Sequence, residues 1–169
     1  MIATTATDAE LAGYVAHIVT AYRSATPAQV ARGQQWYRVA HDLATVIGDG
    51  DVRQGAGIIA ALSAQRRWSV NCQLAADAAS GNVHGQTEQV LAKVRAMLNG
   101  ADPADILPMA LKTGNFYATI ADPSNPDFVV VDRHAHDVAV GEVYGNQNRG
   151  LSNVKRYATL ALAYRLAAR

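Results

Sequence analysis

LKTGNFYATIAD (Leu111–Asp122) and FVVVDRHAHDV (Phe128–Val138) are the two stretches that say most about this chain. Each predicts a helix, and Lys112 precedes the first helix as Asp132 precedes the second. The two residues are about twenty positions apart, and the polar loop between the helices holds two prolines. An amine and a carboxylate at neighbouring helix starts can open the bond between a sugar and its base. The amine attacks the anomeric carbon, and the carboxylate supports the developing positive charge.

Helices are predicted along the rest of the chain as well. Half of the 169 residues are hydrophobic, only 7% are aromatic and alanine dominates, a composition that favours helices over sheets. The length fits one domain with a substantial core. The predicted class is therefore all-α. Apolar periodicity and capping residues place the further helices at 7–25, 27–47, 55–69, 70–78, 87–98, from Asp102 onward, and 152–169.

Charge and cysteine usage exclude several classes of protein. The formal net charge is +1, so nucleic-acid contact would need a local basic patch. The single cysteine, Cys72, excludes an intramolecular disulfide framework and a four-cysteine zinc or iron–sulfur site, and it indicates a cytoplasmic protein. We find no signal peptide and no run of about eighteen apolar residues, so we expect a soluble protein without a membrane partner.

Four short motifs resemble the endonuclease III branch of the helix-hairpin-helix DNA glycosylases. LSAQ (Leu62–Gln65) and SVN (Ser69–Asn71) match one helix pair of that family, and KTGN (Lys112–Asn115) and VDRH (Val131–His134) match its catalytic lysine and aspartate segments. The motifs occur in the family's order, and the resemblance covers about 57–140.

Two departures from the family pattern are clear. The family's hairpin has the form LPGVGxK, whose glycines bring backbone amides to a DNA phosphate and carbonyls to a monovalent cation. This chain has LPMALK (Leu107–Lys112), so we expect a wider or differently shaped turn. It also lacks the cysteines of the family's iron–sulfur cluster, and no cofactor is expected.

The resemblance implies a fold and a mechanism. The fold would be a two-lobed helical bundle, with lobe one at about 52–131 and lobe two formed by 1–51 and 132–169. Lys112 would attack the sugar of a flipped-out nucleotide and Asp132 would support the charge, giving an N-glycosylase with AP-lyase activity, monomeric and bound to DNA. The implied DNA contacts are Gln65, which fills the gap left by the base, and Arg66, Arg67, Thr113 and Asn115; the implied base-pocket residues are Trp68 and Tyr117.

Each of these residues also has a simpler interpretation. Asp132 would be a helix N-cap, and Lys112 a solvated charge. The segment Gln65–Arg67 would be a polar helix end, and Trp68 and Tyr117 would belong to the core. The remaining candidates point away from metal or thiol chemistry. His134 and His136 fall on different faces of a helix, which argues against a metal site, and Cys72 would be a small buried apolar residue.

Two other functions stay open on the sequence alone. The thymine pyrophosphorylases that act on hypermodified phage DNA resemble the same superfamily and also work on an everted base. A noncatalytic nucleic-acid-binding or protein-interaction module would keep the scaffold without the reaction.

Overall fold

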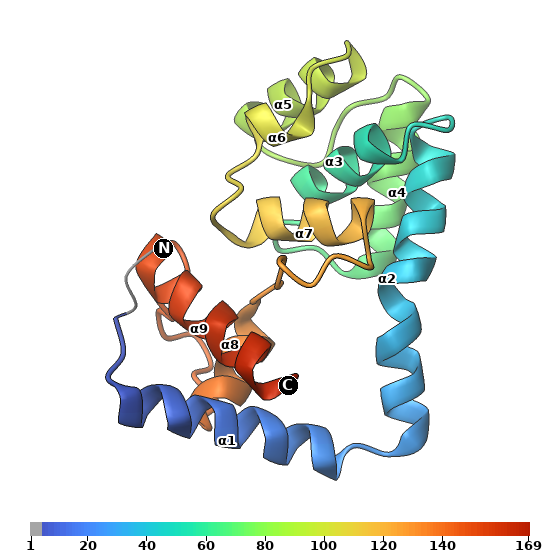
Figure 1. The fold of residues 1–169 in the computed structure, drawn as a ribbon. Coiled ribbons are helices and arrows are strands. Elements are labelled where there is room, and N and C mark those ends of the chain that lie inside the picture. The colour runs from blue at the N-terminus through green and yellow to red at the C-terminus, as the bar shows by residue number, and fades with distance from the viewer. Residues whose placement is uncertain (1–4) are drawn as a thin grey trace.

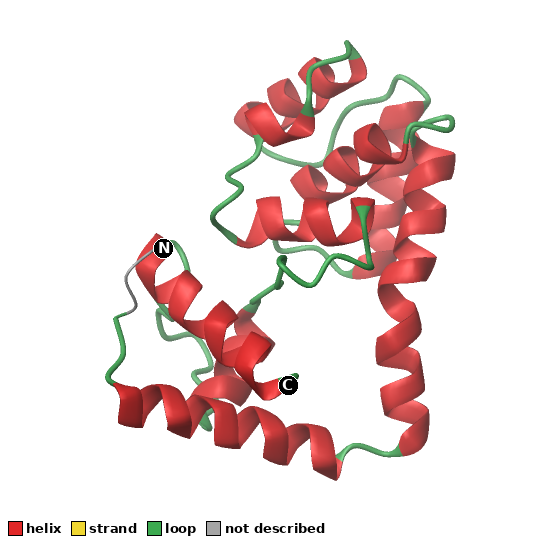
Figure 2. Ribbon diagram, viewed as in Figure 1, coloured by secondary structure: helices red, strands yellow, loops and turns green. Residues whose placement is uncertain are grey.

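The computed structural model describes residues 5–169, and within that range it contains only helices and irregular segments, with no strand. The all-α prediction is confirmed. Figures 1 and 2 show the nine helices of the described range. They are α1 (Asp8–Ser24), α2 (Pro27–Ile47), α3 (Val52–Leu62), α4 (Trp68–Ala79), α5 (Glu88–Leu98), α6 (Pro103–Ile106), α7 (Lys112–Ala121), α8 (Arg133–Val140) and α9 (Val154–Ala167).

Capping explains where the first two helices begin. Thr7 accepts a hydrogen bond from the Glu10 backbone N–H while the Glu10 side chain accepts from Thr7, which is a complete capping box. Thr26 and Gln29 repeat this arrangement at α2, where Pro27 occupies the first turn, in which its missing N–H costs nothing. The chain therefore breaks and restarts between Ser24 and Pro27, and α1 and α2 meet at a corner (Figure 1).

The larger of two hydrophobic cores surrounds α3. Every residue of α3 from Gly55 to Leu62 is buried, and α3 packs against α2, α4, α5, α6 and α7. At Gly57 an added Cβ would lie 2.7 Å from atoms of Met97 and Pro103, so glycine is what allows α3 to approach α5 and α6 this closely.

The smaller core is formed by α1, α8 and α9. It contains Ile18, Val131, Ala139 and the inner face of α9, including Tyr157 and Leu160. Figure 1 shows these helices gathered on one side of the molecule and α3–α7 on the other. The segment 122–132 crosses from the larger core to the smaller one and ends at the start of α8.

The position of α2 differs from the expected division of the chain. Residues 1–51 were expected in the second lobe, whereas the C-terminal half of α2 belongs to the larger core. Ala40, Ala44 and Ile47 are buried there, and α2 packs mainly against α3. The N-terminal half of α2 is mostly exposed.

Candidate functional site

Lys112 is the first residue of α7, and a tight turn fixes its position. The Leu111 N–H donates to the Pro108 carbonyl oxygen at 3.0 Å, which closes a turn over 108–111. No residue of that turn has a positive φ, so it needs no glycine of its own. The turn over 108–111 therefore forms without glycine.

A glycine is needed one turn into α7 instead. At Gly114 an added Cβ would lie 2.2 Å from Met109 Cα and 2.6 Å from the Pro108 carbonyl oxygen. The backbone of the turn therefore rests directly on the first turn of α7. This contact holds the turn, and with it Lys112, against the helix.

Asn115 connects the turn to the crossing segment. Its Nδ2 donates to the carbonyl oxygens of Met109 at 3.1 Å and Leu111 at 3.0 Å, and its Oδ1 accepts from the Val129 N–H at 3.2 Å. Only 8% of Asn115 is exposed. The implied role of Asn115 as a DNA contact does not fit this position, because both of its polar atoms are engaged inside the protein. It positions Lys112 and the segment that leads to Asp132.

The crossing segment is fixed from the other side by Tyr157. The Tyr157 hydroxyl accepts from the Val131 N–H and donates to the Val129 carbonyl oxygen, both at 2.9 Å. Burial raises the pKa of Tyr157 to about 12, so the hydroxyl keeps the proton that it donates at any physiological pH. The backbone just before Asp132 is therefore held by α7 on one side and by α9 on the other.

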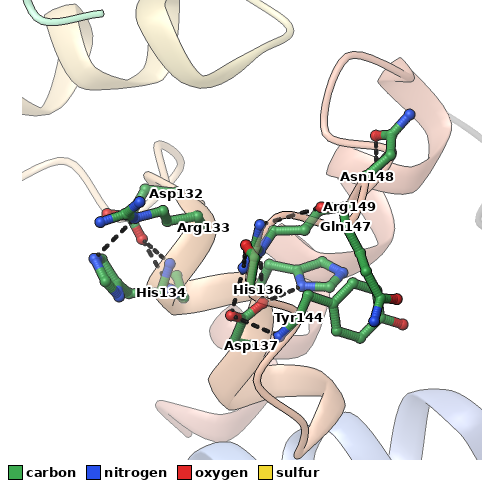
Figure 3. Close-up of polar contacts among 12 residues, drawn as sticks. Asp132, Arg133, His134, His136, Asp137, Tyr144, Gln147, Asn148 and Arg149 are labelled. Carbon is green, nitrogen blue, oxygen red and sulfur yellow. Dashed lines mark hydrogen bonds and ion pairs between the residues drawn. The ribbon is translucent and has the colours of Figure 1, made fainter. Parts of the chain in front are cut away.

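Asp132 is the N-cap of α8, and Figure 3 shows it at the start of that helix. Its Oδ1 accepts from the backbone N–H groups of His134 at 2.9 Å and Ala135 at 2.8 Å. Within residues 5–169 its Oδ2 makes no hydrogen bond. One carboxylate oxygen is thus committed to the helix, and the other remains available.

A cavity of about 440 Å³ brings the two groups together. Lys112 and Asp132 both line it, together with residues from α2, from the connection between α3 and α4, from α4 and from the crossing segment. It lies where the two cores meet, because Lys112 belongs to the helix packed on α3 and Asp132 to the helix packed on α1. An amine and a carboxylate therefore share one solvent-reachable cavity.

Four aromatic side chains form the apolar wall of this cavity. The ring centroid of Trp36 lies 4.8 Å from that of Tyr37, 4.7 Å from that of Trp68 and 6.0 Å from that of Phe116. The plane of the Trp36 ring is inclined by 80° to that of Tyr37, by 54° to that of Trp68 and by 30° to that of Phe116, so the wall is apolar but not flat, and a planar ligand would stack on a single ring. Both tryptophans of the chain are among them.

The aromatic set differs in part from the one that the resemblance implied. Trp68 lines the cavity. Tyr117 does not fit a base pocket: it is 4% exposed, and its hydroxyl accepts from Arg53 Nε at 3.1 Å on another side of α7. Its neighbour Phe116 faces the cavity. Trp36 and Tyr37 fit the apolar stripe of the helix predicted at 27–47, and no motif in the sequence marks them for a cavity.

A family model covers residues 1–169, and its description is that of a family of unknown function, DUF7178. The chain belongs to the DUF7178 family. No curated protein and no solved structure matches the chain. Because membership of DUF7178 assigns no activity, the function has to be argued from the cavity and its surroundings.

In this DUF7178 protein Tyr37 stands close to Asp132 in the cavity. Burial is the main cause of a raised pKa for the Tyr37 hydroxyl, and the negative charge of Asp132 adds to it. The hydroxyl is therefore protonated at neutral pH. It offers the cavity a hydrogen-bond donor.

The predicted DNA-contacting residues lie on the turn between α3 and α4 and at the start of α7. The sequence predicted that Gln65, Arg66 and Arg67 end a long helix, but α3 stops at Leu62 and these three residues form an exposed turn. Gln65 has φ +55°, a left-handed conformation that ends the helix. Arg66 lines the cavity and donates to the Gly85 carbonyl oxygen at 2.6 Å. Thr113 is partly exposed.

Behind Asp132, an ion pair fastens α8 to the loop that follows it. Arg149 donates to Asp137 at 2.6 and 2.7 Å, and the buried His136 lies 2.9 Å from the same carboxylate (Figure 3). Arg149 holds the pKa of Asp137 far below its usual range, which keeps the ion pair intact at neutral pH. His134 is turned outward and accepts from Arg133 Nε at 3.2 Å.

Other candidates for chemistry are sparse in the described range. Residues 5–169 contain no group of three or more His, Cys, Asp or Glu side chains that could hold a metal ion. Cys72 is half-buried, and burial raises the pKa of its thiol, which keeps it protonated.

None of the helices in this range is both long and apolar enough to cross a membrane.

Proposed function

We propose that this protein processes bases in DNA, as an N-glycosylase with AP-lyase activity that acts on a flipped-out nucleotide through Lys112 and Asp132. The observation that carries the proposal is the shared cavity: an amine and a carboxylate oxygen without a protein partner open onto one space with aromatic walls. A lysine that is only a solvated charge and an aspartate that is only a helix cap would not be expected to line the same cavity.

The reaction follows from these two groups. The uncharged Lys112 amine forms a bond to C1′ as the bond between C1′ and the base breaks, and the base departs with the bonding electrons. Asp132 supports the positive charge on the sugar and takes the proton released by the amine. Opening of the sugar ring leaves a Schiff base on Lys112, and loss of a C2′ proton then expels the 3′-phosphate by β-elimination.

The aromatic wall suits the flipped nucleotide. Leaving the duplex costs the base a few kcal/mol, and stacking on an aromatic side chain recovers about 1–3 kcal/mol per base. Trp36, Trp68 and Phe116 line the cavity and can each offer a ring for stacking. Arg66 also lines it, and the exposed Arg67 follows Arg66 in the chain, so both are candidates to meet backbone phosphates.

The test is borohydride trapping on a DNA duplex that contains one abasic site. The chain has only three lysines, Lys93, Lys112 and Lys155, so the amine can be identified without ambiguity. The double variant K93A/K155A should form a covalent adduct as well as the unaltered protein does. Lys112→Ala and Lys112→Arg should form none, because alanine has no amine and guanidinium is not a nucleophile at neutral pH.

Peptide mapping of the adduct distinguishes Lys112 from the terminal α-amine. An adduct that persists in Lys112→Arg would contradict the proposal. So would a folded protein that binds DNA but gives no adduct and no base release on any modified substrate, which is the result expected of a noncatalytic module. Release of pyrophosphate from DNA with diphosphorylated hydroxymethyluracil would instead indicate the thymine pyrophosphorylase type of reaction.

A further inference from the structure

Asn71 carries the one buried side-chain polar atom within residues 5–169 that has no hydrogen-bond partner. That atom is its Oδ1, and the residue is only 1% exposed. Its Nδ2 donates to the Ile59 carbonyl oxygen at 3.1 Å, which fixes the amide, because turning it over would bring two oxygens together. An unpaired buried acceptor is costly, and Asn71 lines the cavity that contains Lys112 and Asp132.

A second acceptor stands at the same end of α3. The Ser63 hydroxyl donates its proton to the Ala60 carbonyl oxygen at 2.8 Å, so its oxygen can offer the cavity only lone pairs. Ile59 and Ala60, the residues that hold Asn71 and Ser63, are consecutive in α3. Both side chains line the cavity, so its wall contains two acceptors that have no proton to donate.

Two acceptors in the wall of one cavity complement a group with two N–H donors. We infer that this cavity selects a nucleobase with an exocyclic amino group, whose two hydrogens are accepted by Asn71 Oδ1 and Ser63 Oγ. The inference rests on the proposed function for the stacking of a flipped base on the aromatic wall. Uracil and thymine lack the amino group, and the carbonyls that flank their single N3–H would face two acceptors and be repelled.

The rest of the polar lining agrees with an amino-bearing base. In cytosine and adenine, a ring nitrogen that accepts a hydrogen bond lies next to the amino group. The protonated Tyr37 hydroxyl and the Arg66 guanidinium are donors in the same cavity. Acceptors for the amino group and donors for its neighbours are both present.

The experiment compares ligands that differ only in the amino group. Deoxycytidine is paired with the pyrimidin-2-one deoxynucleoside, and deoxyadenosine with purine deoxynucleoside. Binding to the full-length protein is followed by quenching of tryptophan emission, since both tryptophans line the cavity. We expect each amino-bearing nucleoside to bind about tenfold more tightly than its partner, because the partner leaves buried acceptors unpaired.

Two substitutions assign the preference. Asn71→Leu should reduce it to about twofold or less, and Ser63→Ala should reduce it in part. Ser63 lies at a helix end, where a change to alanine is tolerated. If Asn71→Leu does not fold, Ser63→Ala therefore tests whether the acceptors cause the preference for an amino group. Asn82→Leu, at an exposed asparagine away from the cavity, is the matched control and should keep the full preference.

The outcomes separate this inference from the proposed function. Three results would overturn the inference: equal binding of the paired nucleosides, no binding of any nucleoside, or an unchanged preference in a folded Asn71→Leu or Ser63→Ala. Such results are expected if a water molecule occupies Asn71 Oδ1. Lys112-dependent adducts and release of thymine-type bases would then leave the proposed function standing. An amino preference without any adduct would support the recognition site and contradict the reaction.

Discussion

The proposed reaction gives Asp132 a second role beside that of a helix cap. Its Oδ1 satisfies two backbone N–H groups at the start of α8, and its Oδ2 is left for the cavity. Asparagine caps a helix about as well as aspartate does, but its side chain carries no charge. The two roles can therefore be separated by substitution.

We predict that Asp132→Asn lowers base release and adduct formation by about 100-fold or more while changing the free energy of unfolding by less than about 0.5 kcal/mol. Asp132→Ala should lose the cap as well and cost about 1 kcal/mol of stability. Urea unfolding and trapping measured on the same preparations check both parts. Activity retained in Asp132→Asn would mean that this carboxylate only caps the helix.

Among single residues, the sequence identified the candidate catalytic pair of the cavity better than the side chains that shape it. Lys112, Asp132, Arg66 and Trp68 all line it. Whether they act there stays a prediction. Trp36 and Phe116 could not be assigned to it, because a helical apolar stripe has the same periodicity whether it faces a core or a cavity. The unpaired state of Asn71 Oδ1 is a property of packing, which no sequence pattern reveals.

The start of α7 depends on a close contact between backbone segments. The turn before it lies on Gly114, where any side chain would collide with backbone atoms that cannot rotate away. The same contact determines where Lys112 stands. A defect at Gly114 would therefore affect both stability and the site.

We predict that Gly114→Ala destabilises the protein by about 3 kcal/mol and weakens adduct formation by Lys112, because the turn must move. Gly13→Ala is the matched control: it replaces a helical glycine with nothing within 4 Å of the added Cβ. It should stabilise α1 by about 0.5–1 kcal/mol. Thermal unfolding of the two variants checks the contrast, and equal effects would show that the close approach at Gly114 is relaxed in solution.

Helix positions were predicted well where caps mark them and poorly where they do not. Thr7, Thr26 and Asp102 begin their helices as expected. The end of α3 was missed because no glycine or proline interrupts the run from Ser63 to Ser69, and the chain instead turns at Gln65 with a positive φ. That conformation puts three predicted DNA contacts on a turn.

The whole molecule carries almost no net charge, so any attraction to DNA must be local. The candidate phosphate contacts that carry a positive charge are Arg66 and Arg67. Two phosphate contacts predict a shallow salt dependence, in contrast to proteins with an extended basic face.

We predict that the logarithm of DNA affinity falls with the logarithm of salt concentration with a slope of about −2. Arg67→Ala should reduce the magnitude of this slope by about 1. Arg23→Ala, at an exposed arginine at the end of α1, should leave it unchanged. Fluorescence anisotropy over a salt series measures both. A much steeper slope would place the main contact surface elsewhere.

The division into two cores could be anticipated only in outline. The sequence shows which helices are amphipathic but not which helix an apolar face meets, so all of 1–51 was expected in one lobe, although the C-terminal half of α2 packs against α3. Long-range contacts decide this, and small residues such as Ala40 and Ala44 allow the close approach.

The chain passes between the two cores at two places, the corner between α1 and α2 and the segment that ends at Asp132 (Figure 1). If one core rotates relative to the other without stretching either connection, the rotation axis must pass through both connections. The cavity includes Val130 and Asp132 of the second connection, so it lies beside that axis. Opening and closing would then shift the outer parts of the molecule much further than they shift the amine and the carboxylate relative to each other.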